Sequence, residues 1–256
     1  MSRKYCTVLL PTIVSLLITG IVYAGPLDDC KEYIKYGVPG VNGDILCRTG
    51  YLIAHDPYCL TPFWTAEYLT SQKASGTLKR KDSFKADPDL QKGHRSELSD
   101  YKGSGYDRGH MVPSGDMAWD EQAMQESFYL SNMVPQDPKM NQVIWSNLEG
   151  KVREWAKERG ELYIYTGPIY DQDQMDTIGD DQVCIPTHIY KIIFDPVKAE
   201  AITFIMPNAP LNTSDMPNYI ASVRDVEDKT GLDFLSVLNK PVQDVVETKK
   251  APSLWQ

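Results

Sequence analysis

The stretch Tyr106-Asp107-Arg108-Gly109-His110-Met111-Val112-Pro113 decides the fold, and a helical segment that begins at Asn141 completes it. His110 follows an arginine and a glycine, and an imidazole that titrates near neutral pH is a suitable base for taking a proton from water. Asn141 is followed by Glu149 and Arg153. These side chains supply a base, an oxygen ligand for a metal ion and a cation for phosphate, so the sequence predicts a hydrolytic site for phosphodiesters.

The segment from Asn141 to Glu158 is predicted to be a helix because its apolar residues recur with helical spacing. The residues of this stripe are Ile144, Leu148, Val152 and Trp155. Asn141, Glu149 and Arg153 fall within an arc of ~120° on one side, so they can face one groove. Glu149 lies ~12 Å along the axis from Asn141, which suits it to holding a metal-bound water. A simpler interpretation makes Asn141 a helix cap and pairs Glu149 with Arg153.

These motifs resemble the DNA/RNA non-specific endonuclease family, which has a ββα-metal active site. The D-R-G-H signature at 107–110 is followed in order by further matching blocks. They are Ser131-Asn132 with Pro135-Gln136, Asn141-Gln142 through Trp145, Leu148-Glu149 and Arg153, the strand Tyr163 to Pro168, and the turn Thr230-Gly231. One such block alone would be a weak signal, but the ordered set is specific. The resemblance covers residues 45–235.

The resemblance implies that His110 is the general base and that Asn141 is the sole direct protein ligand of a divalent ion. Glu149 then orders a metal-bound water. A site with one neutral amide oxygen leaves most positions to water and phosphate, which suits Mg²⁺ because this ion dehydrates reluctantly. Mn²⁺ is the expected substitute. The implied reaction cleaves DNA and RNA to leave 5′-phosphate ends, with little sequence preference because the contacts go to phosphate.

The same resemblance assigns arginines to the phosphate. Arg108 of the signature and Arg153 of the helix both match family positions. An upstream arginine that contacts the transition-state phosphate matches Arg80, although a shift of one residue in the loop would place Lys81 there. Asn132, between the signature and the helix, matches a position with a supporting role.

The expected fold class is α+β, an antiparallel sheet core flanked by helices, with a ββα-metal motif at the active site. Strands and hairpins are predicted where apolar alternation is bounded by turn residues. These strands are 46–54 with 63–69, then 162–166, and 189–194 with 201–206. Two further helices are predicted at 120–132 and 216–230, the last of them ended by Gly231. The tail after Lys240 is expected to be loosely attached.

A single nuclease domain, residues 25–256, is the simplest partition for a chain of 256 residues. Residues 1–24 have the features of a secretory signal peptide, because a positively charged start precedes an apolar run and a cleavage site at Ala24. The alternative is an uncleaved membrane anchor, but the apolar run is shorter than the ~20 residues of a span. The expected location is therefore secreted or periplasmic, with no stable membrane association after cleavage.

Four cysteines, Cys30, Cys47, Cys59 and Cys184, follow the predicted signal peptide. An even number in a compartment that permits disulfides predicts two bridges, with three possible pairings that remain open. A zinc site is the alternative. It is disfavoured because no pair of these cysteines, and no histidine near them, has the usual spacing of zinc ligands.

The formal net charge is −9, which argues against binding DNA through electrostatics alone. Basic residues nevertheless gather between Lys73 and Arg95, directly before the signature, so a local basic groove is expected. DNA and RNA are the expected substrates, a protein inhibitor is a possible partner, and no pattern predicts the oligomeric state. The alternatives are a phosphodiesterase with a narrower substrate, a nucleic-acid-binding module without catalysis, and an extracellular adhesion domain.

The remaining histidines have simpler interpretations than ligation. His55 stands beside Asp56-Pro57 in a predicted turn and is expected to face solvent. His94 is expected in a solvated loop, and His188 is expected to pack at the start of a strand. The acidic residues between 171 and 181 do not have the spacing of a calcium loop and are expected to be solvated.

Overall fold

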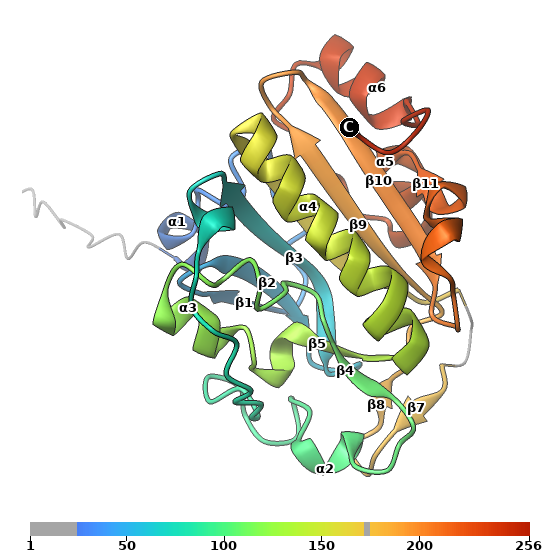
Figure 1. Cartoon of the computed structure of the whole chain (residues 1–256). Helices are drawn as coiled ribbons and strands as arrows, with labels where there is room; N and C mark the ends of the chain where they lie inside the picture. Colours follow the sequence, from blue (N-terminus) through green and yellow to red (C-terminus); the bar gives the residue numbers. More distant parts are fainter. Residues whose placement is uncertain (1–24, 172–174) are drawn as a thin grey trace, which may run out of the picture.

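The structure, a computed structural model, describes residues 25–171 and 175–256 (Figure 1). Its centre is an antiparallel sheet with the strand order β1-β2-β3-β6-β9-β10-β11. The strands are β1 (Asp44–Cys47), β2 (Tyr51–Asp56), β3 (Thr61–Thr70), β6 (Glu161–Ile169), β9 (His188–Asp195), β10 (Glu200–Pro207) and β11 (Ile220–Ala221). The predicted α+β class with an antiparallel core is confirmed.

Helices cover both faces of this sheet, which explains why its central strands are largely apolar on both faces. α4 (Ser146–Arg159) crosses one face, and α5 (Val223–Thr230) and α6 (Lys240–Thr248) pack on the other (Figure 1). Successive residues of a strand point to opposite faces. In β6, Ile164 therefore packs in the core with α4, whereas Tyr163 packs in the core with α5 and α6.

A separate two-stranded sheet carries the signature. β4 (Asp107–His110) pairs antiparallel with β5 (Met133–Gln136). Gly109 is needed in β4 because a Cβ at this position would lie 2.1 Å from the Oε1 atom of Gln136. After β5, the chain passes through a π-helical turn (Met140–Trp145) and continues directly into α4. The two strands and the helix form a ββα unit.

Shorter elements complete the described chain. They are the helices α1 (Pro26–Asp29), α2 (Leu98–Tyr101) and α3 (Glu121–Glu126), the 3-10 turns Lys73–Ser75, Leu130–Asn132 and Thr213–Tyr219, and the strands β7 (Thr177–Ile178) and β8 (Val183–Cys184). β7 and β8 pair with each other beside β5. Apart from one 3-10 turn and α2, the segment 71–105 is irregular.

Both predicted hairpins are confirmed, because β2 pairs with β3 and β9 pairs with β10. The first predicted run is nevertheless two strands. The chain turns at Arg48-Thr49-Gly50, where the amide of Arg48 donates to the carbonyl of Tyr51 at 2.9 Å. The Arg48 guanidinium then leaves the sheet and pairs with the buried carboxylate of Asp87 at 2.6 Å.

The helix predicted at 120–132 is wrong beyond Glu126. α3 begins after Asp120, whose carboxylate accepts hydrogen bonds from two amides of the first turn. The helix ends early because the chain then runs beside the basic loop, where the amide of Leu130 donates to the carbonyl of Lys85 at 2.9 Å. This pairing between distant segments has no local signal in the sequence.

The helix predicted at 216–230 is wrong over its first half. Residues 213–219 form a 3-10 turn that contains Pro217, and β11 follows. α5 begins only after Ser222, whose hydroxyl accepts a hydrogen bond from the amide three residues further on. Its end is as predicted, since Gly231 caps it in the left-handed conformation with φ 70°.

The segment after Lys240 packs against the fold, so the prediction of a loose tail is wrong. The side chain of Asn239 caps α6, and Val246 is buried in the core beneath it. Trp255 then meets Trp155 edge to face with ring centres 5.5 Å apart, and its carbonyl accepts a hydrogen bond from the Trp155 indole at 3.0 Å. No local pattern predicts this contact, because the two tryptophans are 100 residues apart in the sequence.

Two disulfides, Cys30 with Cys47 and Cys59 with Cys184, confirm the predicted number and select one of the three pairings. The first bridge joins the segment after α1 to β1. The second joins the turn between β2 and β3 to β8, across 125 residues of sequence. The pairing depends on which strands meet in space, so it could not be read from the spacing of the cysteines.

His55 is fully buried in β2, which contradicts the predicted solvent-facing turn. Its Nε2 atom lies 2.9 Å from the carbonyl oxygen of His94, and burial lowers the pKa of the His55 ring. The irregular segment 71–105 reaches this ring, and nothing in the local pattern predicts where that segment lies. His94 itself is exposed, as expected.

The predicted signal peptide, residues 1–24, lies outside the described residues. Within the described ranges, no helix is both long enough and apolar enough to cross a membrane.

Candidate active site

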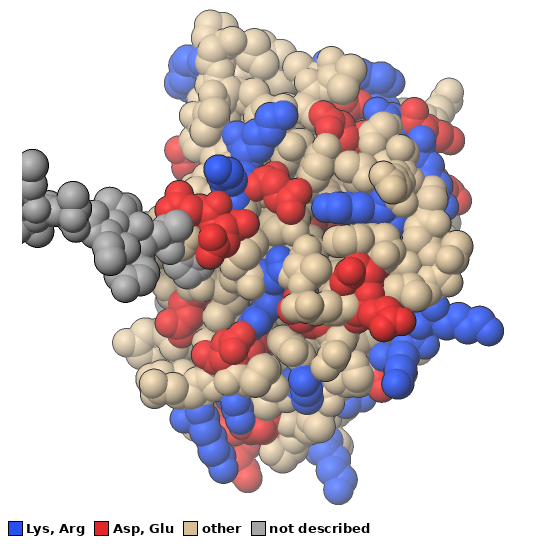
Figure 2. All heavy atoms as spheres, turned by 90° about the vertical axis from the view of Figure 1, so that its left-hand side faces the viewer, with Lys and Arg blue, Asp and Glu red and all other residues tan. Residues whose placement is uncertain are grey.

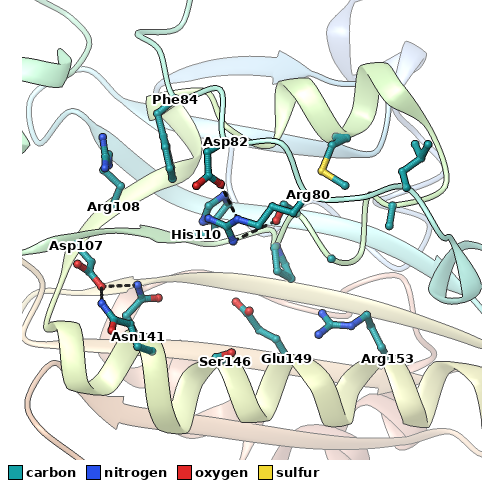
Figure 3. Close-up of a pocket in the computed structure, with 17 residues that line it drawn as sticks. Arg80, Asp82, Phe84, Asp107, Arg108, His110, Asn141, Ser146, Glu149 and Arg153 are labelled. Carbon is teal, nitrogen blue, oxygen red and sulfur yellow. Dashed lines mark hydrogen bonds and ion pairs between the residues drawn. The ribbon is translucent and has the colours of Figure 1, made fainter.

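A groove of about 570 Å³ runs along the ββα unit, between α4 and the segment from Leu78 to Phe84 (Figure 3). Most of the residues predicted for the site line it. These are Arg80, Arg108, His110, Asn141, Glu149 and Arg153. Asn132 and Lys81 do not line it. The groove thus brings together side chains from distant parts of the sequence.

His110 ends β4 and lies against the aromatic rings of Phe84 and Phe128, with ring centres 5.5 and 5.2 Å away. The residue is 8% exposed, and its Nε2 atom is buried without a hydrogen-bond partner in the described chain. Burial, together with the charges of Arg80 and Arg108, lowers the pKa of His110 to about 3, and the charge of Asp82 opposes this shift. The imidazole is therefore neutral at neutral pH, as a general base must be.

Asn141 lies in the π-helical turn that opens the helix. Its Nδ2 atom donates to the Oδ2 atom of Asp107 at 2.9 Å, and Gln142 Nε2 donates to the same oxygen at 2.7 Å. No hydrogen bond within the described chain engages Asn141 Oδ1. The amide oxygen is thus left free in the groove, where it can bind a cation.

The simpler interpretation of Asn141 as a helix cap is wrong. Asp137 caps this helix, because its Oδ1 atom accepts from the amides of Lys139 at 2.9 Å and Met140 at 3.0 Å. The first turn is π-helical rather than α-helical, which adds a residue to the turn and changes the direction of the side chains that follow. Such turns recur at functional sites.

Glu149 and Arg153 of α4 line the groove on the same side as Asn141 of the preceding π-helical turn (Figure 3). Burial raises the pKa of Glu149 to about 7, and the charge of Lys191 opposes this rise. The simpler interpretation required Arg153 to pair with Glu149, but the two side chains do not form an ion pair in the described structure. Its Nη1 atom instead donates at 2.7 Å to Asp116, whose side chain is 1% exposed.

The basic loop places Arg80, and not Lys81, in the groove. Arg80 Nε donates to Asp82 Oδ1 at 2.7 Å and its Nη1 donates to Ser114 Oγ at 3.4 Å. The side chain of Arg80 remains 55% exposed, and Lys81 is exposed away from the groove. Arg108 lies over the ring of Phe84 at 4.2 Å.

Asn132 is fully buried behind the groove. Its Oδ1 atom accepts from the amide of Val112 at 3.0 Å, and its Nδ2 atom donates to the carbonyls of Val112 and Ser127 at 2.9 Å. These bonds hold the backbone two residues after His110. Asn132 therefore has no direct access to a substrate in the groove.

Several residues at the site had no role assigned from the sequence. Asp107 is the first residue of the D-R-G-H signature, but its contact with Asn141 joins two segments that are distant in the sequence. No local sequence pattern predicts such a contact. The same holds for Asp116, which pairs with Arg153. Phe84 follows the basic residues of the loop and gave no separate signal, although it separates Arg108 from His110 (Figure 3).

A ββα unit with a neutral histidine facing a free amide oxygen across an arginine-lined groove defines the class of ββα nucleases. Comparisons with known proteins agree. The family model for DNA/RNA non-specific endonuclease matches residues 30–240. Nuclease C1 of Cunninghamella echinulata is 36% identical over 229 residues, which cover 82% of this chain and 89% of that protein.

Two further comparisons concern endonuclease G. The human mitochondrial protein is 32% identical over 218 residues, covering 80% of this chain and 73% of its own length. A chain from the crystal structure of the EndoG/EndoGI complex superposes with a TM-score of 0.77 at 31% identity, covering 82% of this chain and 92% of that chain. The protein belongs to the DNA/RNA non-specific endonuclease family and is a nuclease, that is, a hydrolase of nucleic acids.

The expected secreted or periplasmic location is wrong in light of these relatives. Human endonuclease G is named mitochondrial, and so are several other matching nucleases. The error has a physical origin in residues 1–24, which contain no acidic residue and begin with basic ones. A scarcity of acidic residues and an excess of basic ones also characterise mitochondrial transit peptides, so these features do not separate the two destinations.

Proposed function

We propose that the protein hydrolyses phosphodiester bonds in both DNA and RNA with little sequence preference, with His110 as the general base and Asn141 as the direct ligand of one divalent ion. The observation that carries this proposal is the position of His110 and Asn141. They line one groove from β4 and from the helix that follows β5 (Figure 3). Neither the family match nor the fold alone assigns these roles.

The residues in the groove fit a small, hard cation such as Mg²⁺. Asp107 holds the amide nitrogen of Asn141 and leaves its oxygen free, while Glu149 adds one carboxylate further along the same helix. A donor set of one amide oxygen and one distant carboxylate leaves most positions to water and phosphate, which is the preference of Mg²⁺. When bound, the ion stabilises negative charge on the phosphate and on the leaving oxygen.

The protein's own residues account for the remaining steps. Neutral His110 accepts a proton from a water molecule, whose oxygen then attacks phosphorus as the bond to the 3′ oxygen breaks. The 3′ oxygen takes up a proton from water, and the phosphate stays on the 5′ oxygen of the downstream fragment. Glu149 would hold water of the ion's hydration shell, and Arg80 with Arg153 would stabilise the charge that develops on the phosphate.

The proposed breadth of substrate follows from the charges in the groove. Arg80, Arg108 and Arg153 contribute cations that can contact phosphate, and such contacts carry no direct sequence information. The face drawn in Figure 2 carries no broad basic field among the described residues. Figure 2 shows acidic side chains interspersed among basic ones on the face that it presents. Binding is therefore concentrated at the groove.

The test is cleavage of supercoiled plasmid and of a structureless RNA by the wild type and by His110→Ala. Each is assayed in Mg²⁺, in Mn²⁺ and in EDTA. We expect degradation of both substrates in either metal, none in EDTA, and loss of cleavage in His110→Ala. End-group analysis should find 5′-phosphates. Binding without cleavage in both metals would overturn the catalytic roles, and cleavage of only one nucleic acid would restrict the substrate.

A protein inhibitor is a second proposed partner. The matching EndoG chain was solved in complex with EndoGI, in a study of the mechanism of EndoG inhibition. The groove of this protein opens to solvent, so a protein can cover it. Titration of EndoGI into the plasmid assay tests the proposal. A dose-dependent loss of cleavage supports it, and unchanged cleavage at a large excess of EndoGI contradicts it.

A further inference from the structure

Polar side chains stand inside the apolar core on the α4 side of the central sheet. Glu67 of β3, Thr166 of β6 and Lys191 of β9 are each at most 1% exposed. Thr166 lies opposite Lys191 in the register of the two strands. Lysine and glutamate are almost never fully buried without a partner, so this placement calls for an explanation. Their neighbours two residues along each strand are the apolar Leu69, Ile164 and Ile193.

Lys191 reaches the backbone that carries the proposed base. Its Nζ atom donates to Thr166 Oγ1 at 2.7 Å and to the carbonyl oxygen of Met111 at 3.3 Å. Met111 directly follows His110 at the end of β4. The ammonium therefore ties the central sheet to the strand whose last residue is His110.

The same ammonium also meets the helix that carries the proposed metal ligand. It lies 5.3 Å from the ring centre of Trp145, which is fully buried in the π-helical turn. Trp145 is four residues after Asn141 and four before Glu149. A cation close to the face of an aromatic ring is attracted to it, most strongly when both groups are removed from water. Lys191 thus contacts both parts of the ββα unit.

The charge of Lys191 offsets buried carboxylates beneath the groove. Glu67 has no hydrogen-bond partner on either carboxylate oxygen in the described structure, and Asp116 is also buried. Burial raises the pKa of Glu67 and of Asp116, and Lys191 and Arg153 oppose the rise in both. Without Lys191, Arg153 would be the one cation of the central sheet and α4 that opposes these rises and the rise at Glu149.

A lysine that served only the sheet would be expected to pair with a neighbouring carboxylate. Lys191 forms no ion pair within the described ranges, although Glu67 stands on the same face of the sheet. It is directed instead at a backbone carbonyl next to His110. The hydrogen bond from Lys191 to the backbone beside His110 favours a role for this lysine in holding the geometry of the hydrolytic site.

We propose that Lys191 is a positioning residue for the hydrolytic site: its ammonium, held by Thr166, fixes the backbone that carries His110 against the helix that carries Asn141 and Glu149. This inference rests on the proposed function, because it requires His110 to act on a substrate in the groove. Lys191 itself does not touch the substrate. Its removal should therefore slow the chemical step and leave substrate binding nearly unchanged.

The test compares Lys191→Met with the wild type on a fixed oligonucleotide in saturating Mg²⁺. Methionine keeps an unbranched side chain and removes the charge and the hydrogen bonds. A displaced base costs rate steeply, since an error of about 1 Å can cost ~100-fold. Because the base would be displaced, we expect kcat to fall at least about tenfold, while KM changes less than about twofold. The ring resonances of His110 in NMR spectra should shift.

The matched control is Ile193→Val, two residues along β9 on the same face and equally buried. It should lower the melting temperature without changing kcat or the His110 resonances.

If Lys191→Met does not fold, Thr166→Val removes only the hydroxyl that holds the ammonium, and kcat should still fall with KM unchanged. The inference is overturned if kcat stays within twofold of the wild type, or if Ile193→Val loses kcat to the same extent. An inactive wild type would instead overturn the proposed function.

Discussion

Asp107 accepts hydrogen bonds from the amides of Asn141 and Gln142, so the first residue of the signature orients the proposed metal ligand. Without this acceptor, the Asn141 amide is free to rotate and can present its nitrogen to the ion. Asp107→Ala should raise the Mg²⁺ concentration for half-maximal activity by about 10–100-fold, the usual effect of losing a partner of a metal ligand. Cleavage rates measured across a Mg²⁺ titration check this.

Asp107→Asn serves as the matched variant for this prediction. Its amide keeps one oxygen that can accept from Asn141, so the shift in Mg²⁺ requirement should be smaller than for alanine. Equal Mg²⁺ requirements in the wild type and both variants would show that Asp107 does not orient the ligand.

Arg80 lines the groove whereas Lys81 does not, although the sequence left the choice between them open. Arg80→Ala should lower kcat/KM by about 100-fold, because removal of one group that stabilises transition-state charge costs 10²–10³-fold. Lys81→Ala should stay within about threefold of the wild type, as expected for an exposed cation screened by salt. Steady-state kinetics on one oligonucleotide at fixed ionic strength decide between them, and the reverse order of losses would assign the contact to Lys81.

At the scale of elements, α5 and α6 meet at a cluster of charged groups. Arg224 pairs with Glu227 at 2.9 Å and with Glu247 at 2.5 Å, and the amide of Phe234 donates to Glu227 at 2.9 Å. Burial raises the pKa of Glu227 from 4.5 to about 7, and Glu247 adds to the rise while the Phe234 amide and Arg224 oppose it. Asp233 also faces this cluster and raises the pKa of Glu227.

This cluster predicts a pH-dependent stability. The folded protein binds the Glu227 proton more tightly than the unfolded chain does, so its contribution is fully present below pH 4.5 and is lost as pH rises through about 7. Glu227→Gln cannot ionise and should flatten the fall in the free energy of unfolding between these pH values. Urea unfolding at several pH values measures it. The control is Glu154→Gln on the exposed side of α4, which should keep the wild-type dependence.

Removing the contact between the end of the chain and α4 should cause a measurable loss of stability. Trp255 packs on Trp155, and the guanidinium of Arg159 lies 3.7 Å from its ring centre. Trp255→Ala should lower the free energy of unfolding by about 1–3 kcal/mol, the range for a partly buried aromatic pair with a stacked cation. Chemical denaturation followed by circular dichroism checks this value. Trp255→Phe should recover part of the loss, and no change in either variant would mean that the chain end contributes nothing.

At the scale of the whole molecule, the two disulfides differ in the length of chain that they close. Cys30 and Cys47 are 17 residues apart, and Cys59 and Cys184 are 125 apart. In the chain-entropy model the longer loop stabilises more, about 4–5 kcal/mol against about 3 for the shorter one. Cys59→Ser with Cys184→Ser should therefore lower the denaturation midpoint more than Cys30→Ser with Cys47→Ser. Equal midpoints would show that native-state contacts outweigh the loop entropy.

The whole fold also explains how a protein with a net charge of −9 can be built to act on a polyanion. Three of its arginines, Arg80, Arg108 and Arg153, line one groove, while acidic and basic side chains mix on the face seen in Figure 2. A local cationic groove can attract phosphate because charges beyond roughly 10 Å are largely screened at ordinary ionic strength. The average composition is therefore a poor guide to the substrate.

Much of the fold could be predicted from local patterns. Alternation of apolar residues located the hairpins, and the stripe through Ile144 and Leu148 located the main helix. Errors came where distant segments decide the local structure. The helix after Asp120 stops early beside Lys85, and the end of the chain packs because Trp155 lies beneath Trp255.

By itself, the sequence determined the residue types of the site, their order along the chain, the family and the number of disulfides, because these are properties of composition and spacing. Only the tertiary structure decided the pairing of the cysteines, the contact of Asp107 with Asn141, the placement of Arg80 over Lys81, and the burial of Lys191 beneath His110. The physical reason is common to all four. Hydrogen bonds and packing act over a few ångströms, so they depend on which distant segments the fold brings together.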